Sequence, residues 1–202
     1  MNNNTHKYPL LVSLDLDECL IYSLPIYKKH TLGKPDFSFD EFQTFKRPGL
    51  DLFIKQLTTD PRFVVGVWTS ATRDYGDQII KNIFPDPSCL QFFFARERCV
   101  KSSSFSGSMY DYGQQINYFK DLQKVVKKTG HPIERIIAVD DVPSYYARQY
   151  SNLVKVPEFI GQKRDNVLQS TLDYLRRLAA LENVRPVEKR GWLSKYDSEL
   201  TL

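Results

Sequence analysis

Short apolar runs alternate along this chain with stretches in which apolar residues recur every three or four positions. The runs are typical of buried strands, and the periodic stretches are typical of helices that bury one face. The pattern predicts strands at residues 9–14, 63–68, 91–94, 136–139 and 153–156. It predicts helices at residues 50–57, 75–83, 117–128 and 168–178, with a loop at 102–113. Strands that alternate with helices indicate βαβ units, so we expect a mainly parallel sheet with helices on both sides.

One stretch, residues 21–46, interrupts this alternation. It is rich in Tyr, Phe, Lys, Pro and Asp, and its Gly33-Lys34-Pro35-Asp36 sequence is typical of a turn, which predicts a hairpin or flap. The length of 202 residues fits one domain with such an insertion. We therefore expect one domain over residues 8–182, with the flap at about 21–46. Residues 183–202 are expected to form a C-terminal tail that docks on the domain or acts as a linker.

The composition is that of an average soluble domain, with 42% hydrophobic and 26% charged residues. It excludes collagen, a disordered tail and a disulfide-stabilised scaffold. The net charge of +4 is spread along the sequence without a basic run, so direct binding to nucleic acid is not expected. The three cysteines, Cys19, Cys89 and Cys99, lack metal-type spacing and are expected to be reduced thiols in or near the core.

No apolar stretch reaches the roughly 18 residues that a membrane span needs. The sequence from Met1 to Lys7 also lacks the apolar core of a signal peptide. We therefore expect an intracellular protein, cytoplasmic or nuclear, and leave export by a non-classical route open.

Polar side chains follow directly after three of the predicted strands. They are Asp15 and Asp17, Thr69 and Ser70, and Asp140 and Asp141. Because ligands gather beyond the carboxyl ends of parallel strands, these residues are expected to meet at one edge of the sheet. Two unit charges about 4 Å apart repel by roughly 4 kcal/mol at an effective dielectric constant of about 20, so three carboxylates there face about 10 kcal/mol of repulsion. A proton or a cation must therefore join them.

The carboxylates offer only oxygen ligands, without His or Cys at ligand spacing. Such a set favours a hard cation, Mg²⁺ before Ca²⁺ or Zn²⁺, and Mg²⁺ typically serves phosphate chemistry. Asp15 and Asp17 are two residues apart at a strand end, which places them on one face with about 6.6 Å between Cα atoms. One can attack phosphorus while the other passes a proton to the leaving oxygen. Thr69 can hold a phosphoryl oxygen, and a lysine is then needed to balance the transition-state charge.

The sequence Asp15-Leu16-Asp17-Glu18-Cys19-Leu20 resembles the Asp-x-Asp-x-Thr nucleophile motif of the haloacid dehalogenase (HAD) superfamily. It is most similar to the Asp-Leu-Asp-Glu-Thr-Leu of the FCP/SCP-like (NLI-interacting-factor-like) protein phosphatases, which act on the RNA polymerase II C-terminal domain and related substrates. Further matches follow in the family's order. They are Lys46-Arg47-Pro48, Trp68-Thr69-Ser70-Ala71 with Tyr75 beyond, Arg96-Glu97-Arg98-Cys99-Val100, Asn117-Tyr118-Phe119-Lys120-Asp121-Leu122 and Val139-Asp140-Asp141-Val142-Pro143.

The resemblance implies a HAD-like Rossmannoid three-layer sandwich with a small flap, and it assigns catalytic roles. Asp15 would be the nucleophile that forms an aspartyl-phosphate, and Asp17 would be the general acid and then the general base. Thr69 would hold the phosphoryl group. Lys120 would be the charge-balancing lysine, although Lys101, Lys124, Lys127 and Lys128 lie in the same part of the sequence.

The resemblance also assigns ligands. Magnesium would be bound by Asp15, by the backbone carbonyl of Asp17 and by Asp141, with Asp140 supporting both the metal and the lysine. Arg96 and Ser70 would contact the substrate beside the phosphorylated residue. Two features depart from the family: Cys19 replaces the usual Thr, whose role is largely structural, and the flap has its own sequence. Because the flap shapes substrate choice in the family, the resemblance implies the reaction more strongly than the substrate.

We therefore predict a monomeric, Mg²⁺-dependent phosphatase of phosphoserine or phosphothreonine in proteins. A HAD-type tyrosine phosphatase is the first alternative, because an open site with a small cap admits either residue. A non-catalytic peptide-binding module is the second, and the intact acids and lysine argue against it. A dehalogenase or a small-metabolite phosphatase is the third; Asp17 argues against the former and the lack of a large cap against the latter.

Overall fold

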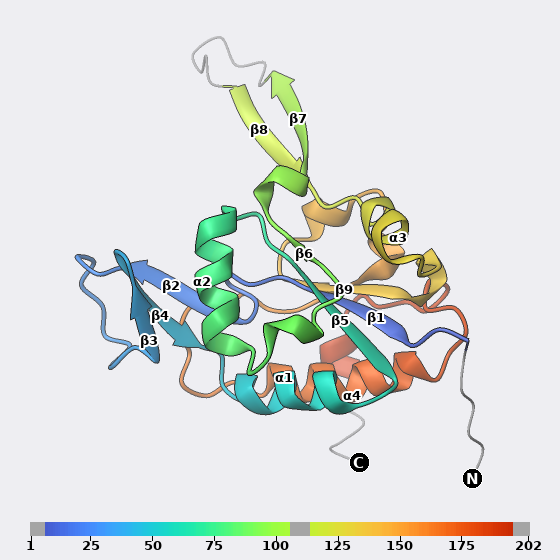
Figure 1. Cartoon of the computed structure of the whole chain (residues 1–202), viewed down its shortest axis with the longest axis horizontal. Coiled ribbons are helices and arrows are strands. Elements are labelled where there is room, and N and C mark those ends of the chain that lie inside the picture. The colour runs from blue at the N-terminus through green and yellow to red at the C-terminus, as the bar shows by residue number, and fades with distance from the viewer. Residues whose placement is uncertain (1–6, 106–113, 196–202) are drawn as a thin grey trace.

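Five strands form a parallel central sheet in the computed structural model, which describes residues 7–105 and 114–195 (Figure 1). The strand order is β10-β9-β1-β5-β6, so the first strand lies in the middle of the sheet. The bounds are β1 Leu10–Leu14, β5 Phe63–Trp68, β6 Phe93–Phe94, β9 Ile136–Asp140 and β10 Leu153–Lys155. Because β1 pairs in parallel with both β5 and β9, the carboxyl ends of these three strands lie side by side.

The alternation of side chains along each strand divides the core into two layers. In β1, Leu10, Val12 and Leu14 pack into one hydrophobic cluster, whereas Leu11 packs into the other. The remaining strands follow the same rule, and Trp68 at the end of β5 joins the second cluster. Burial on both faces explains why these strands read as continuous apolar runs in the sequence.

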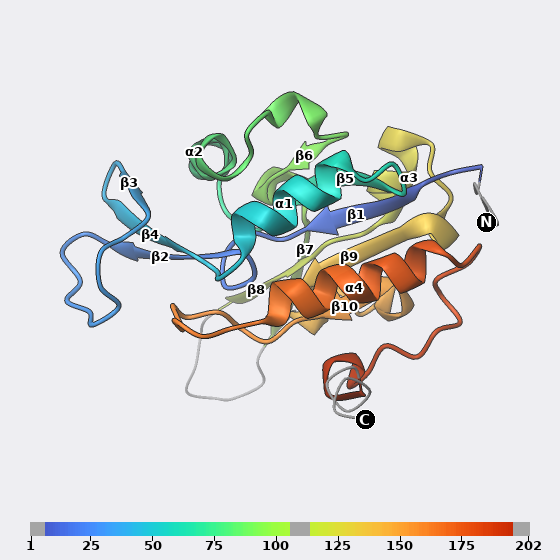
Figure 2. The same ribbon diagram turned by 90° about the horizontal axis from the view of Figure 1, so that it is seen from below.

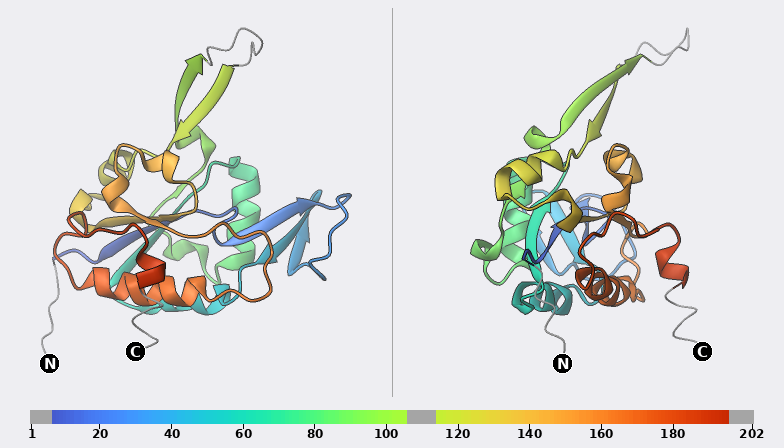
Figure 3. Two further views of the ribbon diagram at one scale, coloured as in Figure 1. Left: turned by 180° about the vertical axis from the view of Figure 1, so that it is seen from behind. Right: turned by 90° about the vertical axis from the view of Figure 1, so that its right-hand side faces the viewer.

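Helices cover both faces of the sheet. On the first face lie α1 Leu50–Thr59, α2 Arg73–Ile83 and α4 Val167–Ala179, with α1 and α4 in contact (Figure 2). On the opposite face, α3 Gln123–Thr129 buries Val125, and Leu122 just before the helix is buried as well (Figure 3). The expected three-layer α/β fold with a mainly parallel sheet is thus confirmed.

Residues 21–46 form a small antiparallel sheet that extends away from the central sheet (Figure 1). Its strands are β2 Ile21–Pro25, β3 Phe37–Phe39 and β4 Phe42–Lys46, in the order β2-β4-β3. The flap that the turn-rich sequence predicts is therefore a three-stranded sheet, not a single hairpin, and we call residues 21–46 the flap.

A second projecting element contradicts two sequence-based expectations. Strands β7 Val100–Phe105 and β8 Gln114–Phe119 pair in an antiparallel hairpin where a loop at 102–113 was expected (Figure 1). The predicted helix at 117–128 is also wrong at its start, since α3 begins only at Gln123. The alternating Gln-Gln-Ile-Asn-Tyr-Phe sequence suits a strand, and pairing with β7 outweighs the weak helical periodicity. Residues 106–113 of the predicted loop lie outside the described residues.

The segment after α4 packs against the domain. Val184 is buried, and its N–H donates to the carbonyl of Glu134 at 3.0 Å. The Trp192 ring is also buried and stacks on Tyr174, while its Nε1 donates to the carbonyl of Lys155 at 2.7 Å. Residues 1–6, which carry most of the signal-peptide prediction, and 196–202 of the predicted tail lie outside the described residues.

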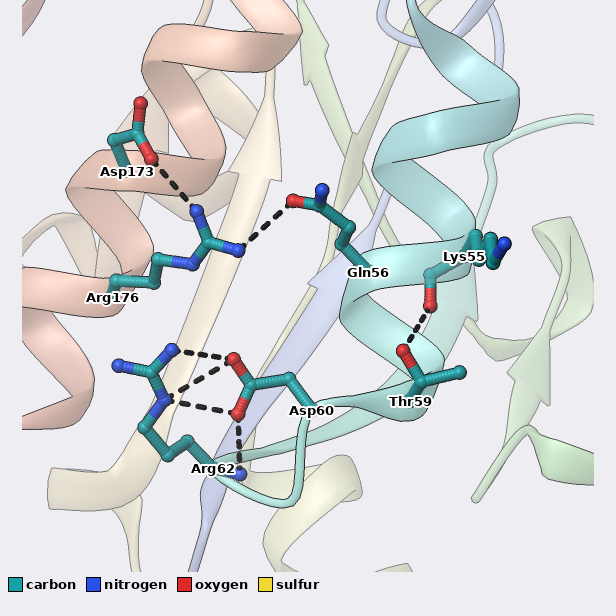
Figure 4. A network of polar contacts seen from close by, with 7 residues as sticks. All are labelled: Lys55, Gln56, Thr59, Asp60, Arg62, Asp173 and Arg176. Carbon is teal, nitrogen blue, oxygen red and sulfur yellow. Dashed lines mark hydrogen bonds and ion pairs between the residues drawn. The ribbon is translucent and has the colours of Figure 1, made fainter.

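A polar network joins α1 to α4 at the amino end of the sheet (Figure 4). Arg176 on α4 donates to Gln56 on α1 and to Asp173, each at 2.9 Å. Where α1 ends, Asp60 accepts from the Arg62 backbone N–H at 3.0 Å and from its guanidinium group at 2.9 Å, just before β5 begins. The network fixes the two helices at the edge opposite to the polar strand ends. Within the described ranges, no helix has the length and apolarity to cross a membrane.

Candidate active site

Three parallel strands deliver the polar residues to one edge of the sheet. Asp15 follows β1 and donates its backbone N–H to the carbonyl of Val139 in β9 at 3.0 Å. Thr69 follows β5, and Asp140 is the last residue of β9. Asp15, Thr69 and Asp140 are all buried. The parallel topology therefore brings together residues that are 125 positions apart in the sequence (Asp15 and Asp140).

Lys120 is fully buried between two of these carboxylates. Its Nζ lies 2.7 Å from Asp15 Oδ1 and 2.6 Å from Asp140 Oδ2. Burial alone lowers the pKa of Lys120, but the carboxylates of Asp140 and Asp15 outweigh it and raise that pKa well above its ordinary value. The turn between β8 and α3 presents Lys120, whose backbone N–H is held by the carbonyl of Tyr145 at 2.9 Å. The buried Lys120 side chain is thus held as a cation between two carboxylates.

The other lysines of this region do not reach the site in the same way. Lys124 donates to the backbone carbonyl of Arg98 at 2.7 Å, and Lys101, Lys127 and Lys128 are exposed. Among these five lysines, the structure thus brings Lys120 to the carboxylates.

The carboxylates of Asp15, Asp140 and Asp141 form a compact group, with one oxygen of each within 4.8 Å of the others. Burial, followed by the charge of Asp140, raises the pKa of Asp15 well above its ordinary value. The same two causes raise the pKa of Asp141 to about 6. Asp141 Oδ1 is buried without a hydrogen-bond partner among the described residues. An all-oxygen group with an unpaired carboxylate oxygen fits a hard divalent cation such as Mg²⁺.

Asp140 has a different environment from its neighbour. Its Oδ1 accepts from the backbone N–H of Val142 at 2.8 Å, and its Oδ2 accepts from Lys120 at 2.6 Å. Both oxygens are therefore engaged by this chain's own donors. This geometry suits a residue that supports Lys120 and the neighbouring acids.

Asp17 is not part of the compact acidic group, and its carboxylate contacts α2. Its Oδ1 accepts a hydrogen bond from the hydroxyl of Tyr75 on α2. Burial raises the pKa of Asp17, which favours the protonated form that a general acid needs. The Tyr75 ring packs in turn against Phe39 and Phe42 of the flap, at centroid distances of 5.5 and 5.3 Å. The helical pattern identifies Tyr75 only as part of an apolar stripe and gives no signal for the role of its hydroxyl.

Thr69, Ser70 and Arg96 lie together in the loops after β5 and β6. The backbone N–H of Ala71 donates to Thr69 Oγ1 at 3.0 Å, which fixes the hydroxyl in place. Arg96 Nε donates to the carbonyl of Ser70 at 2.7 Å, and Ser70 Oγ lies 3.4 Å from the hydroxyl of Tyr145. The guanidinium of Arg96 is thus tethered at an exposed position beside the loop that carries Thr69.

Arg47 organises the loop after β1, a role that sequence reasoning did not assign. It is buried, donates to the carbonyl of Cys19 at 2.9 Å and pairs with Asp165 at 2.9 Å. The Cys19 thiol, in the position of the family's Thr, is buried and donates weakly to the carbonyl of Val139 at 3.7 Å. Of the three free thiols, Cys89 is exposed, so only two of them lie in the core as expected.

Comparisons with known proteins show which family the chain resembles. Residues 10–185 match the family described as NLI interacting factor-like phosphatase. The chain is 25% identical to nuclear envelope morphology protein 1 of Saccharomyces cerevisiae, with 91% of this chain and 42% of that protein aligned. It is 26% identical to a probable C-terminal domain small phosphatase of Dictyostelium discoideum, with 86% of this chain and 52% of that protein aligned. The chain thus spans about half the length of these relatives, or less.

The fold is shared with a solved structure. The structure of Fcp1, an essential RNA polymerase II CTD phosphatase, superposes with a TM-score of 0.51 at 16% identity, covering 84% of this chain and 49% of that chain. This likeness establishes the α/β fold of HAD type. Since the family match covers nearly the whole described chain, the chain belongs to the NLI interacting factor-like phosphatases.

Proposed function

We propose that this chain is a Mg²⁺-dependent protein phosphatase that works through an aspartyl-phosphate on Asp15. The observation that carries the proposal is the buried Lys120 ammonium group between Asp15 and Asp140, at 2.7 and 2.6 Å. A buried cation beside a nucleophilic carboxylate is suited to the negative charge that builds on a transferring phosphoryl group. The unpaired Oδ1 of Asp141 beside them supports the cation site.

In the first half-reaction, a carboxylate oxygen of Asp15 attacks phosphorus. Because Asp15 Oδ1 faces Lys120, Oδ2 is the oxygen left to form the new O–P bond. The bond between phosphorus and the substrate oxygen breaks, and protonated Asp17 gives its proton to the departing oxygen. The Thr69 hydroxyl and the Lys120 ammonium group bind phosphoryl oxygens during the transfer.

In the second half-reaction, water attacks the phosphorus of the aspartyl-phosphate. Asp17, now a carboxylate, takes the proton from this water, and the O–P bond to Asp15 breaks. Inorganic phosphate leaves, and both aspartates return to their starting protonation states. The pKa of Asp17, which burial raises, suits a residue that acts first as an acid and then as a base.

The residues that would hold Mg²⁺ are Asp15, Asp141 and the backbone carbonyl of Asp17, with Asp140 supporting them from its bonds to Lys120 and Val142. Bound there, Mg²⁺ neutralises the carboxylates and part of the charge on the phosphoryl oxygens.

We infer a phosphoprotein substrate, with phosphoserine or phosphothreonine preferred. Relatives named as C-terminal domain small phosphatases support this class. The flap is a small three-stranded sheet, too small to enclose a metabolite, so it leaves the site open to a polypeptide. Arg96, tethered to Ser70, is placed to contact the chain beside the phosphorylated residue. Monomeric state and intracellular location stay predictions.

A panel of phosphoserine, phosphothreonine and phosphotyrosine peptides, incubated with Mg²⁺ or with EDTA, tests this proposal. We expect phosphate release with Mg²⁺, loss of release in EDTA and higher kcat/KM for phosphoserine and phosphothreonine. The Asp15→Asn variant should lose at least about 1,000-fold in kcat because it lacks the nucleophile. Asp74→Asn, at an exposed position on α2, serves as the matched control. Full activity of Asp15→Asn contradicts the mechanism, and fastest turnover of phosphotyrosine contradicts the residue preference.

A further inference from the structure

Two loops that are distant in the sequence meet beside the flap. One is residues 26–34, between β2 and β3, and the other is residues 160–164, between β10 and α4. Leu32 packs directly on Gly161, since a β-carbon at Gly161 would lie 2.6 Å from Leu32 Cδ1. A β-carbon at Gly33 would likewise lie 4.0 Å from Lys163 Nζ. Both loops lie at the flap end of the molecule, far from α3 (Figure 3).

The joined loops concentrate positive charge. Five of the chain's 28 lysines and arginines lie in these two segments, which contain no aspartate or glutamate, whereas the other 23 are outnumbered by the 24 acidic residues. The five are Lys28, Lys29, Lys34, Lys163 and Arg164, all exposed. The fold therefore brings together five cations from two segments that are far apart in the sequence.

The same loops expose large apolar side chains. Tyr27 is 81% exposed, Ile26 58% and Ile160 49%, and they are three of the six large hydrophobic residues exposed in the described part of the chain. Together with the five cations they form a surface that we call the basic surface. Exposed apolar side chains that cluster on a surface mark binding sites, whereas single scattered ones do not.

Internal contacts hold the first loop in place. The Lys28 N–H donates to the carbonyl of Pro25 at 2.9 Å, and Gln43 Nε2 donates to the carbonyl of Lys28 at 3.4 Å. The His30 ring packs edge-on against Phe45 at a centroid distance of 5.1 Å. These contacts involve backbone groups and the His30 ring, so the exposed side chains of Lys28 and Lys29 can bind a partner.

Acidic residues border the two loops, and one of them is already paired with an arginine outside the loops. Asp165 is paired with Arg47 at 2.9 Å, and Asp36 accepts from the Lys46 backbone N–H at 2.8 Å. Glu41 and Glu158 lie at the borders: the Glu41 carbonyl accepts from the Ile26 N–H at 2.8 Å, and the charge of Glu158 acts on Asp141 in the candidate site.

The basic surface is continuous with the candidate active site. The backbone N–H of Phe159 donates at 2.6 Å to the carbonyl of Glu18, the residue after Asp17, and Ile160 follows directly. The first loop is connected to the site through β2, which begins at Ile21. The five residues of β2 separate the site from the first loop, so a substrate chain bound with its phosphoryl group at Asp15 needs an extended segment of at least about that length to reach these cations.

We propose that the basic surface binds an acidic segment of the phosphoprotein substrate, close in sequence to the phosphorylated residue. The five cations complement aspartate and glutamate side chains, and Ile26, Tyr27 and Ile160 contact an apolar residue of the same segment. The position at the rim of the site favours a segment of the substrate over a lipid surface. This inference rests on the proposed phosphatase function and specifies its substrate class.

Peptides with one phosphorylated residue and flanks of Asp/Glu, Asn/Gln or Lys, placed on either side, test this inference. We expect the acidic peptide to have the lowest KM, with a similar kcat for all three. The double variant Lys28→Ala/Lys29→Ala should raise KM for the acidic peptide about five-fold and leave the neutral peptide unchanged, as expected for the loss of two exposed ion pairs. The effect should shrink as salt is added. The pair Lys127→Ala/Lys128→Ala on α3 is the matched control.

Binding without turnover separates this inference from the proposed function. Fluorescence anisotropy with the Asp15→Asn chain measures affinity for the same labelled peptides, so a chain inactive on every phosphoester still reports on the surface. Equal affinity for acidic and neutral flanks overturns the inference, as does equal weakening of both by Lys28→Ala/Lys29→Ala. Binding to phosphatidylserine vesicles that this variant abolishes, with unchanged peptide affinity, assigns the surface to a membrane and also overturns it.

Discussion

Burying a lysine ammonium group away from solvent costs free energy unless anions pair with it. Lys120 meets two, Asp15 and Asp140, and each of those buried carboxylates needs it in return. The individual residues of this site are therefore interdependent: Lys120 limits the repulsion between the acids, and the acids keep Lys120 charged. Asp141 and Asp17 lie outside this ion-pair triad, and their different neighbours give them different roles.

Tyr75 positions Asp17, so removal of its hydroxyl should affect substrates according to their leaving groups. In Tyr75→Phe, Asp17 loses the hydrogen bond that orients it. We expect kcat to fall about ten-fold for phosphoserine peptides, whose leaving alkoxide needs a proton, and less than about two-fold for p-nitrophenyl phosphate. Tyr174→Phe, on α4, is the control. Equal losses on both substrates indicate a structural role instead.

The metal-free protein should lose stability as the pH rises through the pKa of Asp141. Burial and Asp140 raise this pKa from 3.8 to about 6, so between these values the folded state binds more protons than the unfolded state. The stability that protonation of Asp141 contributes to the folded state is fully present below pH 3.8 and is lost as the pH rises through about 6. In EDTA, the Tm of Asp141→Asn relative to that of the wild type should therefore be higher at about pH 8 than at about pH 5.

Thermal unfolding followed by circular dichroism measures this difference. Mg²⁺ should raise the Tm of the wild type more at about pH 8 than at about pH 5, because the ion binds the ionised carboxylates. Parallel Tm curves for the two proteins across this range, with or without Mg²⁺, contradict the expectation.

At the scale of elements, the apolar runs and stripes predicted the central strands and α1, α2 and α4 because each of these buries residues at its own period. The pattern did not predict β7 and β8, since the Ser-rich sequence of β7 has no apolar alternation and pairing between the two strands stabilises both. The close contact of β5 with the segment before β6 was not predictable either. It depends on Gly66, which has no side chain and so has no part in any periodicity.

Gly66 allows the Phe92 ring to lie against β5. A β-carbon at Gly66 would lie 2.2 Å from Phe92 Cε1, so Gly66→Ala forces the ring or the strand to move. We expect this substitution to lower the free energy of unfolding by about 2 kcal/mol, measured by urea denaturation. Gly66→Ala should lower the free energy of unfolding by less when Phe92 is also replaced by Leu than when Phe92 is retained. Strict additivity of the two changes argues against the clash.

Across the whole molecule, the candidate active site lies at one edge of the central sheet, and a network of stabilising polar contacts lies at the other. The carboxyl ends of the central strands carry the acids, the turn between β8 and α3 brings Lys120 to them, and the flap projects from the same end of the sheet (Figure 1). The opposite end carries the Arg176–Gln56 network between α1 and α4 (Figure 4). The C-terminal segment adds a further contact across the fold through Trp192.

Trp192 should contribute to global stability if the C-terminal segment is docked in solution. Its ring is 4% exposed, stacks on Tyr174 and donates to the Lys155 carbonyl. Trp192→Ala should lower the free energy of unfolding by about 3 kcal/mol, because a buried ring and a hydrogen bond are lost. Leu181→Ala, at a more exposed position, should change it by less than about 1 kcal/mol. An unchanged stability of Trp192→Ala indicates a linker.

The sequence by itself determined the α/β fold, the edge of the sheet at which the acids meet and the set of residues available for phosphate chemistry. It could do so because buried strands, their alternation with helices and the polar residues at strand ends can all be recognised from short stretches of sequence. The motif resemblance already selected Lys120, and the tertiary structure placed it between the acids. Only the tertiary structure showed that Asp17 accepts a hydrogen bond from Tyr75 and that residues 26–34 and 160–164 lie together. These features depend on contacts between segments far apart in the chain, and such contacts leave no periodic trace in the sequence.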